Sequence, residues 1–465
     1  MSGNTDEHTN RRTVLKALAG GSTVLLAGCT GGSGGGSGGD SDASEGDSSG
    51  GDSDSSEQTE APEPAEISFW TTQTENERQQ VIKGIVSDFA SSHDPSMEMV
   101  AVKEDDLPSQ IASARASDTL PAVAEWGLGP MQKLGTGGLL SKESAANVIE
   151  SVGRDKFYEG ALKLTEAPDG GNFAVPFHGW LEGFWYSQST FDEKGLDAPT
   201  TWDSILAAAK ELHNPDENQF GIVVGTKKTP FARQCFTPFA RSNGARVFNE
   251  DGEIVFDSPE MVEALEYYAE LAEYTPPGKD TWKTANNTYL NDQCQLIMYS
   301  TYIMDDVAGK SQSLVDDTSF SPYIENERRS SFGQIVTLNV LSSGTDKQRT
   351  AAESFAEYAL SGEKYVDWLH MAPGGMNAVL KPTAQSDAYQ DNETLEAWGD
   401  TVADISNGFE NIERFGYVGG KSFPELGNIT NKFLIAEAVS RVTSGEDAQT
   451  VANEQAEKMR QAIQE

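Results

Sequence analysis

Residue types that commonly carry catalytic or metal chemistry are few and scattered in this chain of 465 residues. Its five histidines are widely separated, and no H-E-x-x-H pattern places two of them on one helix face to hold a zinc ion. The three cysteines form no C-x-x-C, which excludes a zinc or dithiol site of the usual spacing. We therefore expect neither a metal site nor a cofactor.

Other patterns come close to catalytic motifs but lack the context that those motifs need. Residues 416–422 resemble a phosphate-binding loop, yet one residue is missing between the outer glycines and no predicted strand precedes them. The GGSGG stretches within residues 31–39 match a nucleophile elbow only formally, because no strand or helix flanks them. The many carboxylates could include a glycosidase pair, which needs two groups about 5–10 Å apart. A surface-anchored glycoside hydrolase therefore stays open as an alternative.

The charge of the chain is strongly negative. Asp and Glu number 73 against 34 Lys and Arg, which gives a formal net charge of −39. Such a field repels phosphate backbones, so we expect no nucleic-acid partner. Self-repulsion of this size is largely screened at molar salt, where the screening length falls to about 3 Å. We interpret the acidity as adaptation to a very salty medium.

The first residues have the composition of an export signal. Arg11 and Arg12 precede an apolar run, 14–27, that is too short to span a bilayer. Paired arginines are typical of the twin-arginine route. The residues Leu-Ala-Gly before Cys29 look like a lipobox, which implies cleavage there and a lipid on the Cys29 sulfur. We predict a twin-arginine lipoprotein signal peptide over 1–28 and an acidic Gly/Ser linker over 29–66, which is too poor in apolar residues to fold.

Strands and helices are expected to alternate after the linker. Residues 66–70, 97–101 and 121–125 have strand patterns, and apolar residues at helical spacing occupy 75–91 and 107–116. This β-α-β-α-β order predicts a doubly wound α/β sheet, in which ligands bind beyond the carboxyl ends of the strands. Those ends carry residues 70–73 and 125–127.

A second block begins near residue 176. We expect helices at 202–212, 260–274, 346–360, 425–444 and 447–463, and strands at 220–224, 254–256, 295–299 and 335–341.

The order of these landmarks resembles the extracellular solute-binding proteins of ABC importers, specifically the sugar-binding family that includes maltose-binding protein. The resemblance covers about 67–463 and rests on a series of short segments in a shared order. They are Ile67-Ser68-Phe69-Trp70, Leu120-Pro121-Ala122-Val123, Val175-Pro176-Phe177, Pro199-Thr200-Thr201-Trp202, Phe256-Asp257-Ser258-Pro259, Leu296-Ile297-Met298-Tyr299 and Ala372-Pro373-Gly374-Gly375. With the acidic composition, it predicts a halophilic archaeal type of this family.

The resemblance implies a periplasmic-binding-protein-like fold of type II, with two doubly wound α/β lobes joined by hinge strands. One lobe would comprise 67–175 plus 333–374, and the other 176–332 plus 375–465. The chain would cross between them near Pro176, Gly333, Gly374 and Gly375. Crossings that contain Gly or Pro can absorb backbone rotation while the lobes stay rigid.

The resemblance also implies a sugar site. Sugars present C–H faces that pack on aromatic rings and hydroxyl groups that need hydrogen-bond partners. The aromatic candidates are Trp126, Trp180 and Tyr302, although the segment before Tyr302 departs from the Met-x-x-Gly-Pro-Trp that the family usually has. The polar candidates are Gln73, Glu75, Glu125, His178, Glu182 and Arg233. Since Arg233 is the main basic residue among them, acidic or phosphorylated ligands are disfavoured.

The implied partners are a carbohydrate ligand and the permease subunits of an ABC transporter with a cytoplasmic ATPase. The protein would be a monomer and not an enzyme, held to the outer face of the cell membrane only by the lipid at Cys29. A binding protein that serves a sensor is a further alternative. Cys235 and Cys294 would both lie in the second lobe, either as a disulfide or as two buried thiols.

Overall fold

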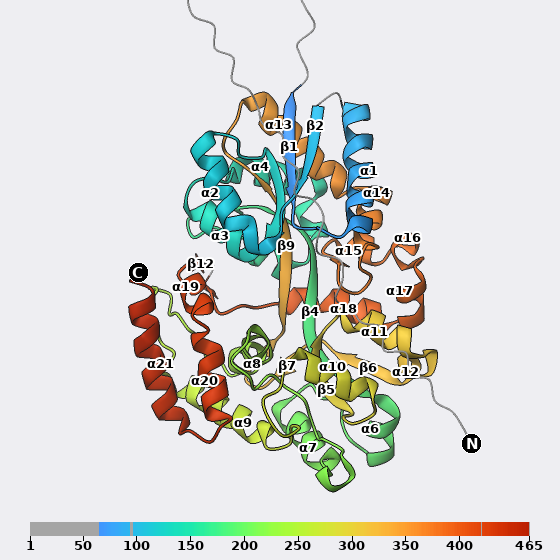
Figure 1. Ribbon diagram of the computed structural model, residues 1–465, viewed down its shortest axis with the longest axis vertical. Helices are drawn as coiled ribbons and strands as arrows, with labels where there is room; N and C mark the ends of the chain where they lie inside the picture. The colour runs from blue at the N-terminus through green and yellow to red at the C-terminus, as the bar shows by residue number, and fades with distance from the viewer. Residues whose placement is uncertain (1–64, 94–95, 420, 465) are drawn as a thin grey trace, which may run out of the picture. The chain divides into compact units, whose positions relative to one another are not determined.

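A computed structural model describes residues 65–93, 96–419 and 421–464, all within one compact unit, Pro62–Glu465 (Figure 1). The predicted signal peptide, the predicted lipid site at Cys29 and the predicted linker up to residue 64 lie outside the described residues. Within the described part of the chain, no helix is long and apolar enough to cross a membrane.

One eight-stranded sheet organises the fold. Six strands follow one another in the order β10-β4-β9-β3-β1-β2, and β5 and β6 both pair with β4. Their bounds are β1 Glu66–Thr71, β2 Ser96–Ala101, β3 Val123–Gly127, β4 Val175–Ser187, β5 Leu296–Ser300, β6 Thr318–Ser321, β9 Phe332–Val340 and β10 Asn377–Ala378. Two short pairs complete the strands: β7 Ile324–Glu325 with β8 Arg329–Ser330, and β11 Tyr417–Val418 with β12 Lys421–Ser422.

The predicted β-α-β-α-β start is confirmed. Helices α1 (Asn76–His93) and α2 (Leu107–Ser117) separate β1, β2 and β3, and these three strands are parallel. In α1 the side chains of Ile82, Ile85, Val86 and Phe89 are buried, as their spacing predicts. Beyond β3 the sheet is mixed rather than purely parallel, because β9 returns from the opposite direction and pairs antiparallel with β3.

Strands β4 and β9 connect two groups of strands (Figure 1). Residues 336–340 of β9 pair with β3, and residues 332–338 pair with β4 on the other side. The second half of β4 in turn pairs with β5 and β6. We call β1–β3 with their helices the first region, and β5 and β6 with theirs the second region. Pro176 lies inside β4, next to an irregularity in its pairing with β9, and Gly333 lies inside β9.

Helices cover both regions. Besides α1 and α2, those of the first region are α3 Leu128–Thr136, α4 Lys142–Val152, α5 Glu159–Lys163, α13 Asp346–Ala359 and α14 Gly362–Leu369. The larger ones elsewhere are α6 Gln188–Lys194, α7 Trp202–Leu212, α8 Pro230–Ser242, α9 Pro259–Ala272, α10 Trp282–Leu290, α11 Ile303–Lys310, α18 Thr401–Gly408, α20 Leu434–Val442 and α21 Ala448–Ala462. Short helices are α12 Gln312–Asp317, α15 Lys381–Ala384, α16 Asp387–Gln390, α17 Glu393–Trp398 and α19 Leu426–Asn431.

Two predicted strands are reduced to isolated bridges. Residues 220–224 make single bridges from Phe220 and Val223 to the β5 segment, and 254–256 makes one from Ile254. At Gly221 a Cβ would lie 1.9 Å from the Ala209 carbonyl oxygen of α7. The chain is therefore pressed against a helix there, which prevents a regular ladder.

Candidate functional site

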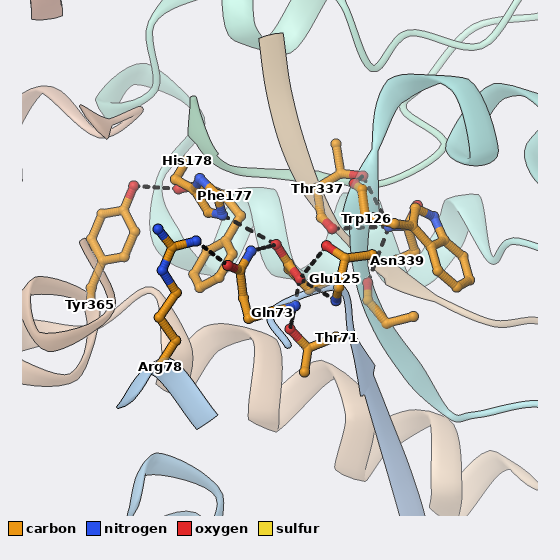
Figure 2. Close-up of polar contacts among 12 residues, drawn as sticks. Thr71, Gln73, Arg78, Glu125, Trp126, Phe177, His178, Thr337, Asn339 and Tyr365 are labelled. Carbon is orange, nitrogen blue, oxygen red and sulfur yellow. Dashed lines mark hydrogen bonds and ion pairs between the residues drawn. The ribbon is translucent and has the colours of Figure 1, made fainter. Parts of the chain in front are cut away.

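A buried carboxylate on β3 is the centre of the polar network in Figure 2. Glu125 has no exposed surface. Its Oε2 accepts hydrogen bonds from Thr71 Oγ1 at 2.8 Å, from the Thr72 backbone N–H at 3.0 Å and from Thr72 Oγ1 at 3.2 Å. Its Oε1 accepts one from Gln73 Nε2 at 3.1 Å and lies 3.3 Å from His178 Nε2. Every donor comes from the last residue of β1, from the loop directly after it or from β4.

These donors keep the carboxylate charged. Burial alone raises the pKa of Glu125, but the hydrogen bond and charge of His178, with the bonds from Thr72 and Thr71, outweigh burial and lower it. The site thus holds a fixed negative charge on Glu125, and both oxygens of this carboxylate already accept hydrogen bonds from the protein.

The network reaches the surface through α1. Arg78 donates from Nη1 to Gln73 Oε1 at 2.9 Å, and the same nitrogen lies 3.7 Å from Glu75. The Glu75 side chain is 61 % exposed. Gln73 is therefore held at both ends of its amide, while Glu75 is free to meet solvent.

Strand register places four of the predicted polar and aromatic side chains on one face of the sheet. Residues directly opposite each other share a face, and so do residues two apart along a strand. On β9 the even-numbered residues from Phe332 to Leu338 therefore share a face. Their partners are Glu125, His178, Trp180 and Glu182.

Trp126 lies apart from this group. It is paired with Thr337, on the opposite face, and has no exposed surface. Figure 2 shows its indole pointing away from Glu125. Alternation along β3 explains the difference, because consecutive residues point to opposite faces. In this structure Trp126 is a core residue rather than a surface on which a sugar ring could stack.

An aromatic and cationic cluster lies beside the crossing strands. The half-buried Trp180 ring is 6.0 Å from the Phe332 ring, measured between centroids. The guanidinium carbons of Arg233 and Arg414 lie 5.8 and 4.8 Å from the Phe332 centroid. Sequence analysis identified Trp180 and Arg233 but missed Phe332 and Arg414. Phe332 could have been found from its place next to the predicted crossing at Gly333, but no local signal marks Arg414.

Glu182 is the second buried carboxyl group of this face, and it differs from the first. Among the described residues, only the Cys235 thiol is within hydrogen-bond distance of its carboxyl group, with Sγ 3.6 Å from Oε1. Burial raises the pKa of Glu182 to about 8, and the thiol opposes this only in part. Glu182 is therefore largely protonated at neutral pH. Cys235 and Cys294 are both buried free thiols, so the structure contains no bond between them.

Tyr302 comes from the second region and lies close to the first. It precedes α11 and is 41 % exposed. Burial of the hydroxyl raises its pKa, and the charges of Arg78 and Glu125 act on it in opposite senses. A Cβ at Gly375 would lie 2.1 Å from the Tyr302 ring, so only glycine fits below it. Asn377 donates to the carbonyl oxygens of Gly179 and Gly374, which ties this crossing to β4.

The structure thus brings most of the predicted site residues together. Gln73, Glu125 and His178 form one network, and Arg78 extends it. Trp180, Glu182 and Arg233 lie along or beside the crossing strands, while Tyr302, from the second region, lies near the Glu125 network. Within the described ranges, no group of three or more His, Cys, Asp or Glu side chains could hold a metal ion.

Comparisons with known proteins agree with this architecture. The family model for bacterial extracellular solute-binding proteins matches residues 74–364. The chain is 29 % identical over 403 residues to the ABC transporter periplasmic-binding protein YcjN of Escherichia coli K12, a match that covers 86 % of this chain and 93 % of that protein. It is 26 % identical over 270 residues to the arabinooligosaccharide-binding protein of Halalkalibacterium halodurans, covering 54 % and 57 % of the two chains.

A solved structure shows the same fold at lower identity. The cyclic α-maltosyl-1,6-maltose binding protein of Arthrobacter globiformis superposes with a TM-score of 0.69 at 16 % identity, over 86 % of this chain and 99 % of that one. The fold is therefore periplasmic-binding-protein-like, with a mixed α/β sheet. Since the family model covers more than half of its length, the chain belongs to the bacterial extracellular solute-binding proteins, a family of non-enzymatic binding proteins of ABC transporters.

Proposed function

We propose that this protein captures a sugar or oligosaccharide outside the cell and delivers it to the permease subunits of an ABC transporter with a cytoplasmic ATPase. Family membership supports the transport role, and the names of the relatives that bind arabinooligosaccharides or cyclic maltosides support a carbohydrate. The single observation that carries the site is that polar and aromatic groups of both regions converge beside β4 and β9.

The two regions correspond, in this proposal, to two lobes of 67–175 plus 333–374 and 176–332 plus 375–465. Pro176, Gly333, Gly374 and Gly375 act as the hinge. The φ of +78° at Gly374 is one that residues with a side chain rarely adopt, which fits a crossing that must turn sharply. Ligand stabilises the closed form because only that form lets both lobes contact it.

The proposal includes attachment to the membrane. The arginine pair, the apolar run and the lipobox at Cys29 occur in the order of a twin-arginine lipoprotein signal. A lipid on Cys29 followed by the acidic linker would hold the folded part near the outer face of the membrane. The acidic surface would suit a very salty medium.

Thermal unfolding of the full-length protein in molar salt, with and without a panel of mono- and oligosaccharides, tests the binding function. A ligand at 100 times its Kd adds about 2.7 kcal/mol to the free energy of unfolding. Because sugars at high concentration stabilise many proteins by exclusion from the surface, the L-enantiomer of each monosaccharide serves as the control. A shift confined to one class supports the proposal. Unchanged melting with every sugar, in a cooperatively folding sample, contradicts a carbohydrate ligand.

A further inference from the structure

Two arginines beside the crossing strands have no acidic partner within the described part of the chain. The Arg233 guanidinium makes no hydrogen bond or ion pair with any described residue, and its Nε is fully buried. Arg414 donates from Nη1 to the Gly333 carbonyl oxygen at 2.9 Å and to Gln334 Oε1, both uncharged acceptors. Both guanidiniums lie against the same ring, that of Phe332.

This pair is unusual in a chain with 73 acidic residues. Other arginines of the second region do find carboxylates: Arg241 and Arg328 share Glu413, Arg441 pairs with Glu446, and Arg460 pairs with Asp257. Burial, and to a smaller extent the like charge of Arg414, lower the pKa of Arg233 from 12.5 to about 9. Phe332 gives each cation a weak attraction, but no group among the described residues neutralises the two charges.

The surroundings favour an anion. A cavity of about 390 Å³ that includes Arg414 adjoins the pair, although Arg233 and Trp180 do not line it. Its lining is net positive, with seven basic residues against three acidic ones: Lys163, Arg241, Arg246, Arg328, Arg329, Arg414 and Lys421 against Glu166, Glu410 and Glu413. The Tyr417 hydroxyl, which also lines it, is buried and has no hydrogen-bond partner among the described residues. Both arginines are only partly exposed to solvent. A charge that is partly removed from water without a counter-charge costs free energy, and a bound anion would supply that counter-charge. The planar guanidinium fork matches carboxylate and phosphate oxygens particularly well.

We propose that the ligand is an anionic carbohydrate, whose carboxylate or phosphate group is held by Arg233 and Arg414 while its ring packs on Trp180. This inference rests on the proposed function and narrows its substrate class. The sequence led us to expect that acidic ligands are disfavoured, because Arg233 was the main basic candidate. The inference replaces that expectation, because Arg414 lies beside the same Phe332 ring. The carboxylates of the face do not oppose it, since Glu125 is covered by donors and Glu182 is largely protonated.

Calorimetric titration of the full-length protein with matched sugars tests the class. The probes are glucose, galactose and maltose, their uronic acids, and their phosphate esters. We expect at least one anionic member to bind ten times or more tighter than its neutral parent, and uronates and phosphates compared side by side identify the group. Neutral parents that bind as tightly as their acids would overturn this inference and leave the proposed function standing. Binding of no carbohydrate at all would overturn both.

The variant Arg233→Gln tests the residue, with Arg115→Gln on the exposed face of α2 as the matched control. We expect Arg233→Gln to weaken binding of the anionic sugar by about 30-fold or more and to collapse its advantage over the neutral parent. The ligand-free variant should melt at the same or a higher temperature, because an unpaired cation is removed. An unchanged affinity, or an equal loss for the neutral and anionic sugars, would overturn the assignment.

Discussion

The two sides of the candidate site differ in whether their charged side chains have partners within the protein. In the first region, Glu125 accepts hydrogen bonds from Thr71, Thr72 and Gln73 and faces His178, so its negative charge is fully accommodated before any ligand arrives. Beside the crossing strands, Arg233 and Arg414 have no acidic partner among the residues that the structure describes, and Arg414 donates only to uncharged acceptors. The Glu125 side therefore needs no ligand to satisfy its charge, whereas the arginine side lacks a counter-charge within that part of the chain.

This difference suggests a division of roles: the Glu125 network supports the structure of the site, and the arginine side recognises the ligand. Hydrogen bonds to a buried charge rigidify the groups that make them, so the Glu125 network fixes the loop after β1 and orients the Gln73 amide. Arg233 and Arg414 have only weak stabilising contacts, with the Phe332 ring and, for Arg414, with uncharged acceptors. We therefore expect them to act mainly through the anion that they bind. Substitutions on the first side should therefore change stability, and substitutions on the second should change affinity.

The largest effect is expected from Glu125→Ala. Removing this carboxylate leaves the buried donors of Thr71, Thr72 and Gln73 without an acceptor, which should lower the free energy of unfolding by about 3–5 kcal/mol. The measurement is urea denaturation at fixed high salt and pH 7. Glu75→Ala, on an exposed side chain four residues beyond Thr71, is the control and should change stability by about 0.5 kcal/mol or less.

The same variant has a pH signature. The pKa of Glu125 is lowered in the folded protein below its ordinary value of 4.5. Its stabilising contribution is therefore complete above pH 4.5 and is lost as the pH falls through the folded pKa. The gap between wild type and Glu125→Ala should narrow in acid. A gap that stays constant down to the acid transition would mean that the hydrogen bonds, and not the charge, carry the contribution.

Glu182→Gln should have the opposite sign and a somewhat smaller size. The pKa of Glu182 rises from 4.5 to about 8 on folding, so the wild-type protein loses stability as the pH rises between those values. Glutamine keeps the shape without the ionisation. We expect equal stability near pH 4 and an advantage for the variant of the order of 3 kcal/mol at pH 8, from urea denaturation at both pH values. A variant less stable than wild type at pH 8 would contradict the raised pKa.

Trp180→Ala should act on affinity. Its half-buried ring next to Phe332 offers a surface for a sugar ring, so we expect binding to weaken by about 1–3 kcal/mol while cooperative unfolding persists. The measurement is titration with whichever sugar shifts the melting temperature.

Trp126→Ala is the matched comparison for Trp180. Because Trp126 is fully buried on the opposite face, its loss should cost about 3–5 kcal/mol of stability. If Trp126→Ala instead weakened sugar binding and left stability unchanged, the assignment of Trp126 to the core and of Trp180 to the ligand site would be contradicted.

These two tryptophans also show how far the sequence could lead. The β-α-β-α-β start and the residues near the strand ends follow from local periodicity, which is why Gln73 and Glu125 could be placed together. Trp126 and Glu125 are neighbours in sequence, and only the register of β3 with β9 decides which of them faces the site. Arg414 lies far along the chain from Arg233, and no local pattern predicts that Phe332 brings them together.

The smallest effect is expected from Arg78→Gln. This variant tests whether the hydrogen-bond network around Glu125 needs the contact of Arg78 with Gln73. Arg78 is partly exposed, its contact with Glu75 is 3.7 Å, and its one strong bond is to Gln73 Oε1. A surface pair of this kind contributes about 0–1 kcal/mol, so urea denaturation should shift little. If Arg78→Gln proved as costly as Glu125→Ala, then the Gln73 amide would be oriented from the surface by Arg78, and the buried carboxylate would not be the group that holds the network together.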